Sequence, residues 1–212
     1  MKSFANKDGM PIVKNMIRAI QDNKEYLSEV DGAIGDGDHG INMNKGFSIC
    51  EKRLEGKDFS LSESLSVLGK VLMMEIGGSM GPLYGKFFMG MFKASKEQQT
   101  IDKEVFESMI KNGLDGIVEI GNAKIGDKTL LDCLIPAQQA FSKAAADGLD
   151  FDEVLRIMKD AAEKGKDSTK DLVAKVGRSS RLGERSRGVL DAGAVSCNLI
   201  LQAMADSILK LI

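Results

Sequence analysis

The chain has few of the residues on which redox, zinc-binding and secreted proteins depend. Its 212 residues include one histidine, three cysteines, three prolines and no tryptophan. The cysteines are far apart and none belongs to a Cys-x-x-Cys pair, which disfavours a structural zinc site. Because their number is odd and their surroundings are apolar, we expect reduced and buried thiols. These cysteines are Cys50, Cys133 and Cys197.

A charge excess and a long apolar run are also missing. The chain has 29 Lys and Arg against 31 Asp and Glu, a net charge of -2, whereas a general nucleic-acid binder usually carries a basic excess. No uncharged run approaches the roughly 20 residues that a membrane helix needs. Residues 1–8 lack the apolar core of a signal peptide. We therefore expect a cytoplasmic protein that binds neither nucleic acid nor membranes.

Helix-forming residues dominate what is present. Apolar side chains recur at helical spacing, as in Val13, Met16 and Ile20. We expect an all-α chain, a single domain over residues 1–212 built as an antiparallel bundle or barrel of about eight helices. The expected helices begin near Met10, cover 42–54, begin at Ser60 and after Pro82, cover 103–120, begin near Thr129, and cover 152–176 and 194–211.

Glycine-rich segments separate these helices at residues 31–42, 77–85, 121–129 and 177–193. They precede alternate helices, and alternate connections of an up-and-down bundle lie at the same end. We therefore expect all four segments to meet at one end of the bundle and to form one composite site.

The first segment carries the most specific pattern. Asp31, Asp36, Asp38 and the single histidine, His39, fall within nine residues and are spaced by glycines. Carboxylates held this close repel one another, so their ionised forms call for a cation. Aspartate oxygens are hard ligands that suit Mg²⁺ or Ca²⁺. The pattern indicates a metal and phosphate site, and an acidic surface loop that binds nothing is the alternative.

Two familiar motifs do not fit the sequence. An EF-hand starting at Asp36 would need glycine and a carboxylate where Ile41 and Phe47 stand. A Walker A loop would need glycine at Met80 and Ser or Thr at Phe87. The site is therefore neither an EF-hand nor a Walker A phosphate loop.

The other three segments have features that suit anion binding. Residues 77–85 lead into a helix and could cradle a phosphate, although a packed turn would have the same pattern. Residues 121–129 also end at a helix start, which Asp127 could cap. Residues 177–193 are basic and glycine-rich, which favours contact with an anion over a merely solvated surface.

As a set, these segments resemble the ADP-binding L subunit of dihydroxyacetone kinases. The resemblance implies an all-helical bundle with adenine nucleotide, ADP or ATP, and a pair of Mg²⁺ ions at one end. It also implies a partner K subunit that holds the sugar, and an M subunit of the phosphotransferase system that rephosphorylates bound ADP. The matching motifs follow the family's order and are residues 35–44, 77–85, 126–129, 183–186 and 191–196.

The resemblance also assigns roles position by position. It implies that Asp31, Asp36 and Asp38 are metal ligands, and it gives this chain no catalytic nucleophile. Phosphorylation of His39 is an alternative, but the neighbouring residues favour a nucleotide contact. The implied nucleotide contacts are His39, Gly40, Ile41, Asn42, Ser79, Met80, Gly121, Leu130, Arg178, Asp191, Ala192 and Gly193.

Three departures from the family pattern leave alternatives open. Met80 stands where the family often has serine, Arg181 replaces an aromatic residue, and Ala192 replaces a proline. A kinase subunit that uses free ATP, or one that serves another short ketose such as erythrulose, fits the same residues. A non-catalytic nucleotide-binding paralogue that regulates a partner is the third alternative.

Overall fold

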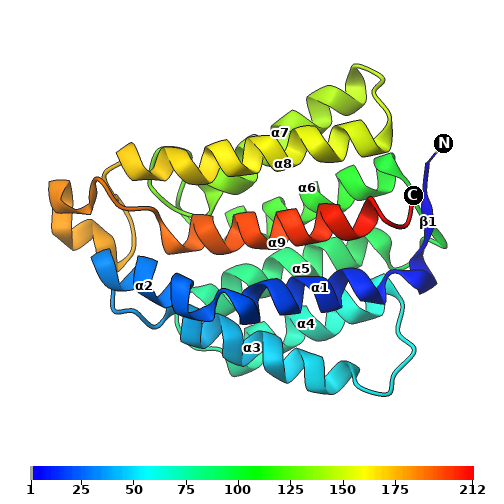
Figure 1. The fold of residues 1–212 in the computed structure, drawn as a ribbon, viewed down its shortest axis with the longest axis horizontal. Helices are drawn as coiled ribbons and strands as arrows, with labels where there is room; N and C mark the ends of the chain where they lie inside the picture. Colours follow the sequence, from blue (N-terminus) through cyan, green and yellow to red (C-terminus); the bar gives the residue numbers. More distant parts are fainter. Residues whose placement is uncertain (1) are drawn as a thin grey trace.

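Helical spacing of the apolar residues produces helices along nearly the whole chain in the computed structural model, which describes residues 2–212. Figure 1 shows an elongated bundle whose long helices run side by side, which confirms the predicted all-α bundle. The α-helices are α1 Met10–Asp22, α2 Lys24–Ile34, α3 His39–Leu54, α4 Leu61–Glu75, α5 Met80–Ser95, α6 Lys103–Ile120, α7 Leu131–Ala146, α8 Phe151–Ser168 and α9 Ala192–Ile208.

Short elements complete the fold. The 3-10 helices are η1 Asn6–Asp8, η2 Thr169–Asp171 and η3 Arg178–Ser186. Strands β1 Phe4–Ala5 and β2 Thr100–Ile101 form an antiparallel ladder that the sequence pattern did not predict. Within residues 2–212, no helix combines the length and the apolar character needed to cross a membrane.

Local capping explains why several helices begin where the sequence predicts. Ser60 Oγ accepts the backbone N–H of Glu63 at 3.2 Å, and the Glu63 carboxylate accepts the N–H of Ser60 in return. Asp102 likewise accepts the N–H of Val105 at 2.9 Å at the start of α6. Each side chain satisfies a donor that the first turn of a helix leaves unpaired.

The predicted connection at residues 31–42 is wrong at both ends. Asp31 lies inside α2, which buries Leu27, Val30 and Ile34 on one face, and α3 begins at His39, earlier than expected. The sequence prediction missed a short helix here because the region is rich in glycine, although the apolar residues of this helix keep helical spacing. α2 follows α1 in the same general direction (Figure 1). The longer helices therefore still alternate in direction along the chain, as predicted.

The bounds of three other helices differ from the sequence prediction, and α9 covers Ala192–Ile208 rather than 194–211. α5 begins at Met80, so that Pro82 lies in its first turn, where a missing N–H is tolerated. α8 ends at Ser168 rather than near Val176. The chain tightens into η2 there, where the carbonyl oxygen of Thr169 accepts the N–H of Leu172 at 3.3 Å and a hydrogen bond from Lys128 Nζ.

Packing of the long helices creates one continuous apolar core. α5 packs between α4 and α6, α7 packs on α8, and α1 packs on α9. Aromatic side chains gather in two clusters, which stack with edge contacts or tilted rings. One contains Phe47, Phe87 and Phe88, and the other contains Phe106, Phe141 and Phe151.

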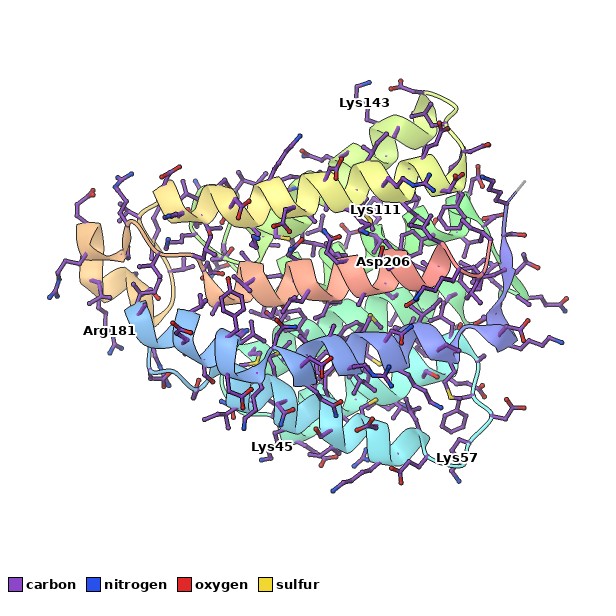
Figure 2. All side chains as sticks on the ribbon, in the orientation of Figure 1. Lys45, Lys57, Lys111, Lys143, Arg181 and Asp206 are labelled. Atoms are coloured by element: carbon purple, nitrogen blue, oxygen red, sulfur yellow. The ribbon has the colours of Figure 1, made fainter. Side chains whose placement is uncertain are left out.

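The two ends of the bundle differ in composition. β1, η1, β2 and both chain termini lie at one end, which we call the closed end (Figure 1). The connections at 35–38, 76–79, 121–130 and 169–191 lie at the opposite end, which we call the loop end. The prediction that the four glycine-rich segments share one end is confirmed. Arg181 on η3 is labelled at the loop end in Figure 2.

Candidate functional site

Three aspartates form an acidic cluster at the loop end. The last turn of α2 supplies Asp31, and the connection to α3 supplies Asp36 and Asp38. One carboxylate oxygen from each lies within 4.8 Å of the others. A Cβ atom at Gly35 would lie 2.9 Å from the backbone carbonyl oxygen of Asp31, which is too close for an ordinary side chain, so glycine is favoured there. Three hard oxygen donors at this separation fit a Mg²⁺ or Ca²⁺ ion.

Arg178 brings positive charge to this cluster. Its guanidinium group forms an ion pair with the Asp36 carboxylate, although it comes from η3, far along the chain. Gly177 precedes it with φ +70°, and Gly183, with φ +54°, kinks η3. Glycine adopts these backbone angles without strain, so the basic segment can fold back over the acidic one.

His39 is the first residue of α3 and lies against the acidic cluster. Its backbone N–H points to Asp31 Oδ2 at 3.4 Å, and its ring Nε2 lies 2.9 Å from Ser196 Oγ on α9. Burial lowers the pKa of His39 to about 4, and the nearby Asp31 carboxylate offsets this only in part. The ring is therefore neutral near pH 7.

The residues that follow His39 have distinct environments. Gly40 is buried, and a Cβ atom there would meet the Lys24 carbonyl oxygen at 2.0 Å, so this glycine lets α3 approach α2. Ile41 is 55% exposed, and Asn42 is half-buried in the same helical turn. All three lie at the N-terminal end of a helix, whose free N–H groups attract anions.

The connection before α5 is open. Ser79 is exposed and is the N-cap residue of α5, but its side chain makes no capping bond, and Met80 is half-buried. A Cβ atom at Gly77 or Gly78 would meet nothing within 4 Å. The packed-turn alternative is therefore disfavoured at these two glycines, and the first N–H groups of α5 can be approached from solvent.

A buried lysine links the connection at 121–130 to the connection at 169–191. Lys128 is 2% exposed and donates from Nζ to the carbonyl oxygens of Thr169 and Val189. Asp127 reinforces this junction because its carbonyl oxygen accepts the N–H of Lys175 at 3.1 Å. Asp127 does not cap α7 as expected; Asp132 accepts the N–H of Thr129 at 2.7 Å instead.

Asp191 begins α9 and is the N-cap that the sequence did not assign. Its Oδ2 accepts the N–H of Ala194 at 2.7 Å. Burial raises the pKa of the Asp191 carboxyl group to about 7, against the opposing effects of that hydrogen bond and of Lys128. Ala192 is buried, and a Cβ atom at Gly193 would lie 3.4 Å from the backbone N of Leu130. The end of the 169–191 connection therefore lies against the 121–130 connection.

The structure thus brings several of the predicted site residues together. Asp31, Asp36 and Asp38 meet Arg178, and His39 reaches the start of α9. Gly121, which ends α6, and the segment of Ser79 and Met80 lie at the same end, but no direct hydrogen bond joins them to the acidic cluster in the described residues.

Sequence reasoning assigned no role to four residues that organise this end. Tyr84, Lys128 and Ser196 lie inside the quoted motifs, and Asp132 lies in the first turn of α7. Buried polar residues in helical, apolar surroundings were the signal that could have identified them, because such groups need partners.

Comparison with known proteins gives one family for this arrangement. The model of the DAK2 domain family matches residues 33–206. The "PEP-dependent dihydroxyacetone kinase 1, ADP-binding subunit DhaL" of Listeria innocua is 40% identical over 189 residues, covering 89% of each chain. The "PTS-dependent dihydroxyacetone kinase, ADP-binding subunit DhaL" of Lactococcus lactis is 39% identical over 188 residues, covering 88% of this chain and 90% of that protein.

A solved structure has the same fold. The crystal structure of the dihydroxyacetone kinase of C. freundii in its native form superposes with a TM-score of 0.73 at 25% identity. The match covers 96% of this chain but 35% of that kinase chain, so this chain corresponds to about a third of the longer protein.

Proposed function

The chain belongs to the DAK2 domain family, and from this premise we propose that it is the ADP-binding phosphotransferase subunit of a dihydroxyacetone kinase. In this role it passes a phosphoryl group from nucleotide to dihydroxyacetone that a separate K subunit holds. The observation that carries the proposal is the cluster of three carboxylates facing Arg178 at the loop end. The names of the Listeria and Lactococcus relatives support it.

In this proposal Asp31, Asp36 and Asp38 bind a pair of Mg²⁺ ions. Their oxygens are hard donors, and their separation lets them share a small divalent cation. When bound, Mg²⁺ neutralises charge on the bridging phosphate oxygens. The chain's own contribution is to hold these carboxylates close together despite their repulsion.

Helix N-termini provide the remaining phosphate contacts. His39, Gly40, Ile41 and Asn42 begin α3, Ser79 and Met80 begin α5, and Asp191, Ala192 and Gly193 begin α9. Free N–H groups at such ends attract phosphate oxygens. Arg178 adds a charged donor, and Gly121 and Leu130 border the nucleotide between these ends.

Phosphoryl transfer needs accurate alignment and charge stabilisation more than covalent chemistry by the protein. The loop end meets this need with rigid helix starts around the acidic cluster, and we assign no nucleophile to this chain. The sugar is held elsewhere, on the K subunit. The M subunit of the phosphotransferase system rephosphorylates the bound ADP in place, and the whole relay operates in the cytoplasm.

Reconstitution tests the proposal. We expect phosphorylation of dihydroxyacetone when the purified chain, a K subunit, Mg-ADP and a phosphoenolpyruvate-driven M-subunit relay are combined. The chain without K should give no product, and Asp36→Asn with K should give none either. Turnover by the chain alone, or no turnover in the complete mixture, would contradict the proposal.

Desalting distinguishes the phosphate donors. If ADP serves as a resident carrier, the purified chain keeps ADP through gel filtration in the presence of Mg²⁺. Ready exchange together with turnover from free ATP would favour the ATP-dependent alternative. Replacing dihydroxyacetone with erythrulose in the complete mixture tests the choice of ketose on the K subunit.

A further inference from the structure

Residues 170–188, which we call the arginine loop, leave the bundle and return to it at one narrow base. The N–H of Gly188 donates to the Lys170 carbonyl oxygen at 2.7 Å, and the N–H of Asp191 donates to Thr169 Oγ1 at 3.0 Å. The loop contains η3 and projects beyond the long helices at the loop end (orange in Figure 1). Loops whose ends lie close together are compact units, so the contacts at the base decide where such a loop points.

The arginine loop is also braced internally. Ser186 is 0% exposed, and its Oγ accepts the N–H of Ala174 at 2.9 Å and donates to the Gly183 carbonyl oxygen at 2.6 Å. Arg187 donates to the carbonyl oxygen of Asp171. These bonds join the outgoing and returning halves of the loop, so the loop keeps its shape and its attachment sets its orientation.

One buried side chain holds both ends of the arginine loop. Lys128 Nζ donates to the carbonyl oxygens of Thr169 and Val189, which lie on either side of the loop. A lysine ammonium group has three donors, so a single side chain can serve both oxygens. Lys128 is 2% exposed. It therefore ties the base of the loop to the 121–130 connection.

The backbone at Lys128 adopts an unusual conformation. Its φ is +64°, and among the residues that the structure describes it is the one non-glycine residue with a positive φ. Glycine adopts this conformation without strain, and asparagine adopts it more readily than lysine. Neither side chain could reach both carbonyl oxygens, so the conformation indicates that this position requires the long lysine side chain.

The side of the base that faces α2 is open. A cavity of about 580 Å³ lies between α2 and the base. Its lining includes Tyr26 and Val30 of α2, and Lys170, Val189 and Leu190 at the base. Because α2 does not fill this space, packing supports the base little on this side, and the bonds from Lys128 carry the attachment.

A second attachment lies close to Arg178. The carbonyl oxygen of Asp127 accepts the N–H of Lys175 at 3.1 Å, and Lys175 Nζ lies 3.5 Å from Asp127 Oδ1. Arg178 follows three residues later and reaches the carboxylate of Asp36. Arg178 therefore lies between two points at which neighbouring residues, Asp127 and Lys128, hold the loop.

We propose that Lys128 is a positioning residue, which directs Arg178 toward the phosphates of a bound nucleotide by fixing both ends of the arginine loop. The inference rests on the proposed function for its phosphate partner. Lys128 acts through Arg178 and makes no contact with the nucleotide. A direct attraction between the Lys128 charge and the phosphates is the rival explanation, and it would operate whether or not Arg178 is present.

Amide hydrogen exchange tests the attachment without nucleotide. Lys128→Met keeps an unbranched side chain but removes every donor, so the base loses two hydrogen bonds. We expect the N–H groups of Lys175, Gly188 and Asp191 to exchange roughly tenfold faster in this variant, with wild-type exchange in α1. Wild-type exchange at all three groups would overturn the proposal.

A double-mutant cycle on Mg-ADP affinity separates the proposal from its rival. Lys128→Met should weaken binding roughly tenfold, because Arg178 loses much of its charged hydrogen bond to phosphate. In an Arg178→Ala background, Lys128→Met should weaken binding less than twofold further, since the group that it positions is already absent. Fully additive losses would favour direct attraction and overturn the proposal, as would wild-type affinity in Lys128→Met alone.

Ser186→Ala provides a second variant whose folding does not depend on Lys128. It removes the internal brace in a loop outside the apolar core, so the bundle should stay folded. It should also weaken Mg-ADP binding, about threefold to tenfold, and this loss should vanish in the Arg178→Ala background. Wild-type affinity in Ser186→Ala would contradict the premise that the shape of the loop delivers Arg178.

Two matched controls lie at the closed end. Lys103 Nζ donates to the Leu149 carbonyl oxygen at 2.9 Å, and its side chain is 15% exposed. Ser64 is 0% exposed, and its Oγ donates to the Ser60 carbonyl oxygen at 2.8 Å. Lys103→Met and Ser64→Ala should leave the exchange at the loop base and the Mg-ADP affinity unchanged. Weaker nucleotide binding in either control would count against a specific role for Lys128.

The outcomes also separate this inference from the proposed function. If the wild-type chain does not bind Mg-ADP, the proposed function fails, and the exchange measurement still decides whether Lys128 fixes the base of the loop. Wild-type binding of Mg-ADP, with additive losses in the cycle, would reject the positioning role alone.

Discussion

The closed end and the loop end of the bundle use polar side chains in opposite ways. At the closed end, Asn6 is buried and its amide donates to Ser62 Oγ at 2.8 Å and to the carbonyl oxygens of Ser95 and Gln98. At the loop end, carboxylates gather within 4.8 Å and are exposed or half-buried. Paired neutral groups favour stability, whereas clustered charges favour a ligand at the expense of stability.

Removing one charge from the acidic cluster should have the largest effect on function. Asp36→Asn or Asp38→Asn should abolish Mg²⁺-dependent ADP binding, because the remaining carboxylates give a cation too little charge. Without Mg²⁺, the melting temperature of Asp38→Asn should stay equal or rise, because like-charge repulsion falls, whereas Asp36→Asn also loses the ion pair with Arg178. Calorimetry and thermal unfolding measure the two effects. The surface variant Asp147→Asn is the control, and unchanged ADP affinity in both cluster variants would contradict the metal site.

The second prediction is a pH dependence confined to the loop end. Burial raises the pKa of Asp191 from an ordinary value near 4 to about 7, so the folded state binds this proton more tightly than the unfolded state. The contribution of Asp191 to stability is therefore fully present below about pH 4 and declines as the pH rises to about 7, by up to about 4 kcal/mol.

Asp191→Asn isolates this contribution. Asparagine is also a good N-cap, so the hydrogen bond to the N–H of Ala194 has a replacement acceptor. We expect the variant to lose the decline of unfolding free energy between pH 4 and 7 that Asp191 causes. Urea unfolding with a chelator present measures it, and identical pH profiles for variant and wild type would contradict the raised pKa.

At the closed end the expected effect is on stability alone. Asn6→Ala removes the amide group that donates to Ser62 Oγ and to the Gln98 carbonyl oxygen and that accepts the buried backbone N–H of Ser62, so we expect a loss of about 3 kcal/mol in unfolding free energy. ADP affinity should not change. Asn112→Ala, on the exposed side of α6, is the control. Weaker ADP binding by the Asn6 variant would show that the two ends are coupled.

The smallest expected effect concerns Arg178. Arg178→Ala should weaken ADP binding by about 1.5–3 kcal/mol, the range for a hydrogen bond to a charged group. Mg-ADP should also slow tryptic cleavage within η3, because a closed segment is a poor protease substrate. Arg185→Ala, on the same element, is the matched control. Equal cleavage with and without Mg-ADP would argue against closure of this segment.

The sequence predicted those features that depend on local pattern. Ser60 and Asp102 begin their helices as expected because a cap is specified within three residues. The gathering of four glycine-rich segments at one end followed from the alternation of helices, which did not depend on exact boundaries. The cluster of Asp31, Asp36 and Asp38 followed from short spacing along the chain.

What the sequence could not predict depends on contacts between distant residues. Just after α8 ends, the Thr169 carbonyl oxygen accepts a hydrogen bond from Lys128, a residue 41 positions earlier in the chain. The pairing of Tyr84 with Ser196 joins residues 112 positions apart, and no local spacing indicates it. α2 was missed for a different reason, because its one glycine and its aspartate favour a loop while its three buried residues favour a helix.

Both termini lie at the closed end, away from the acidic cluster (Figure 1). A fluorescent label, an affinity tag or a fused domain at either terminus would therefore project from the face opposite the loop end. A chain immobilised on a sensor through its N-terminus or its C-terminus would present the same face to solution. Nucleotide affinities measured in these two orientations should agree, and a large protein attached at either end should leave docking at the loop end unobstructed.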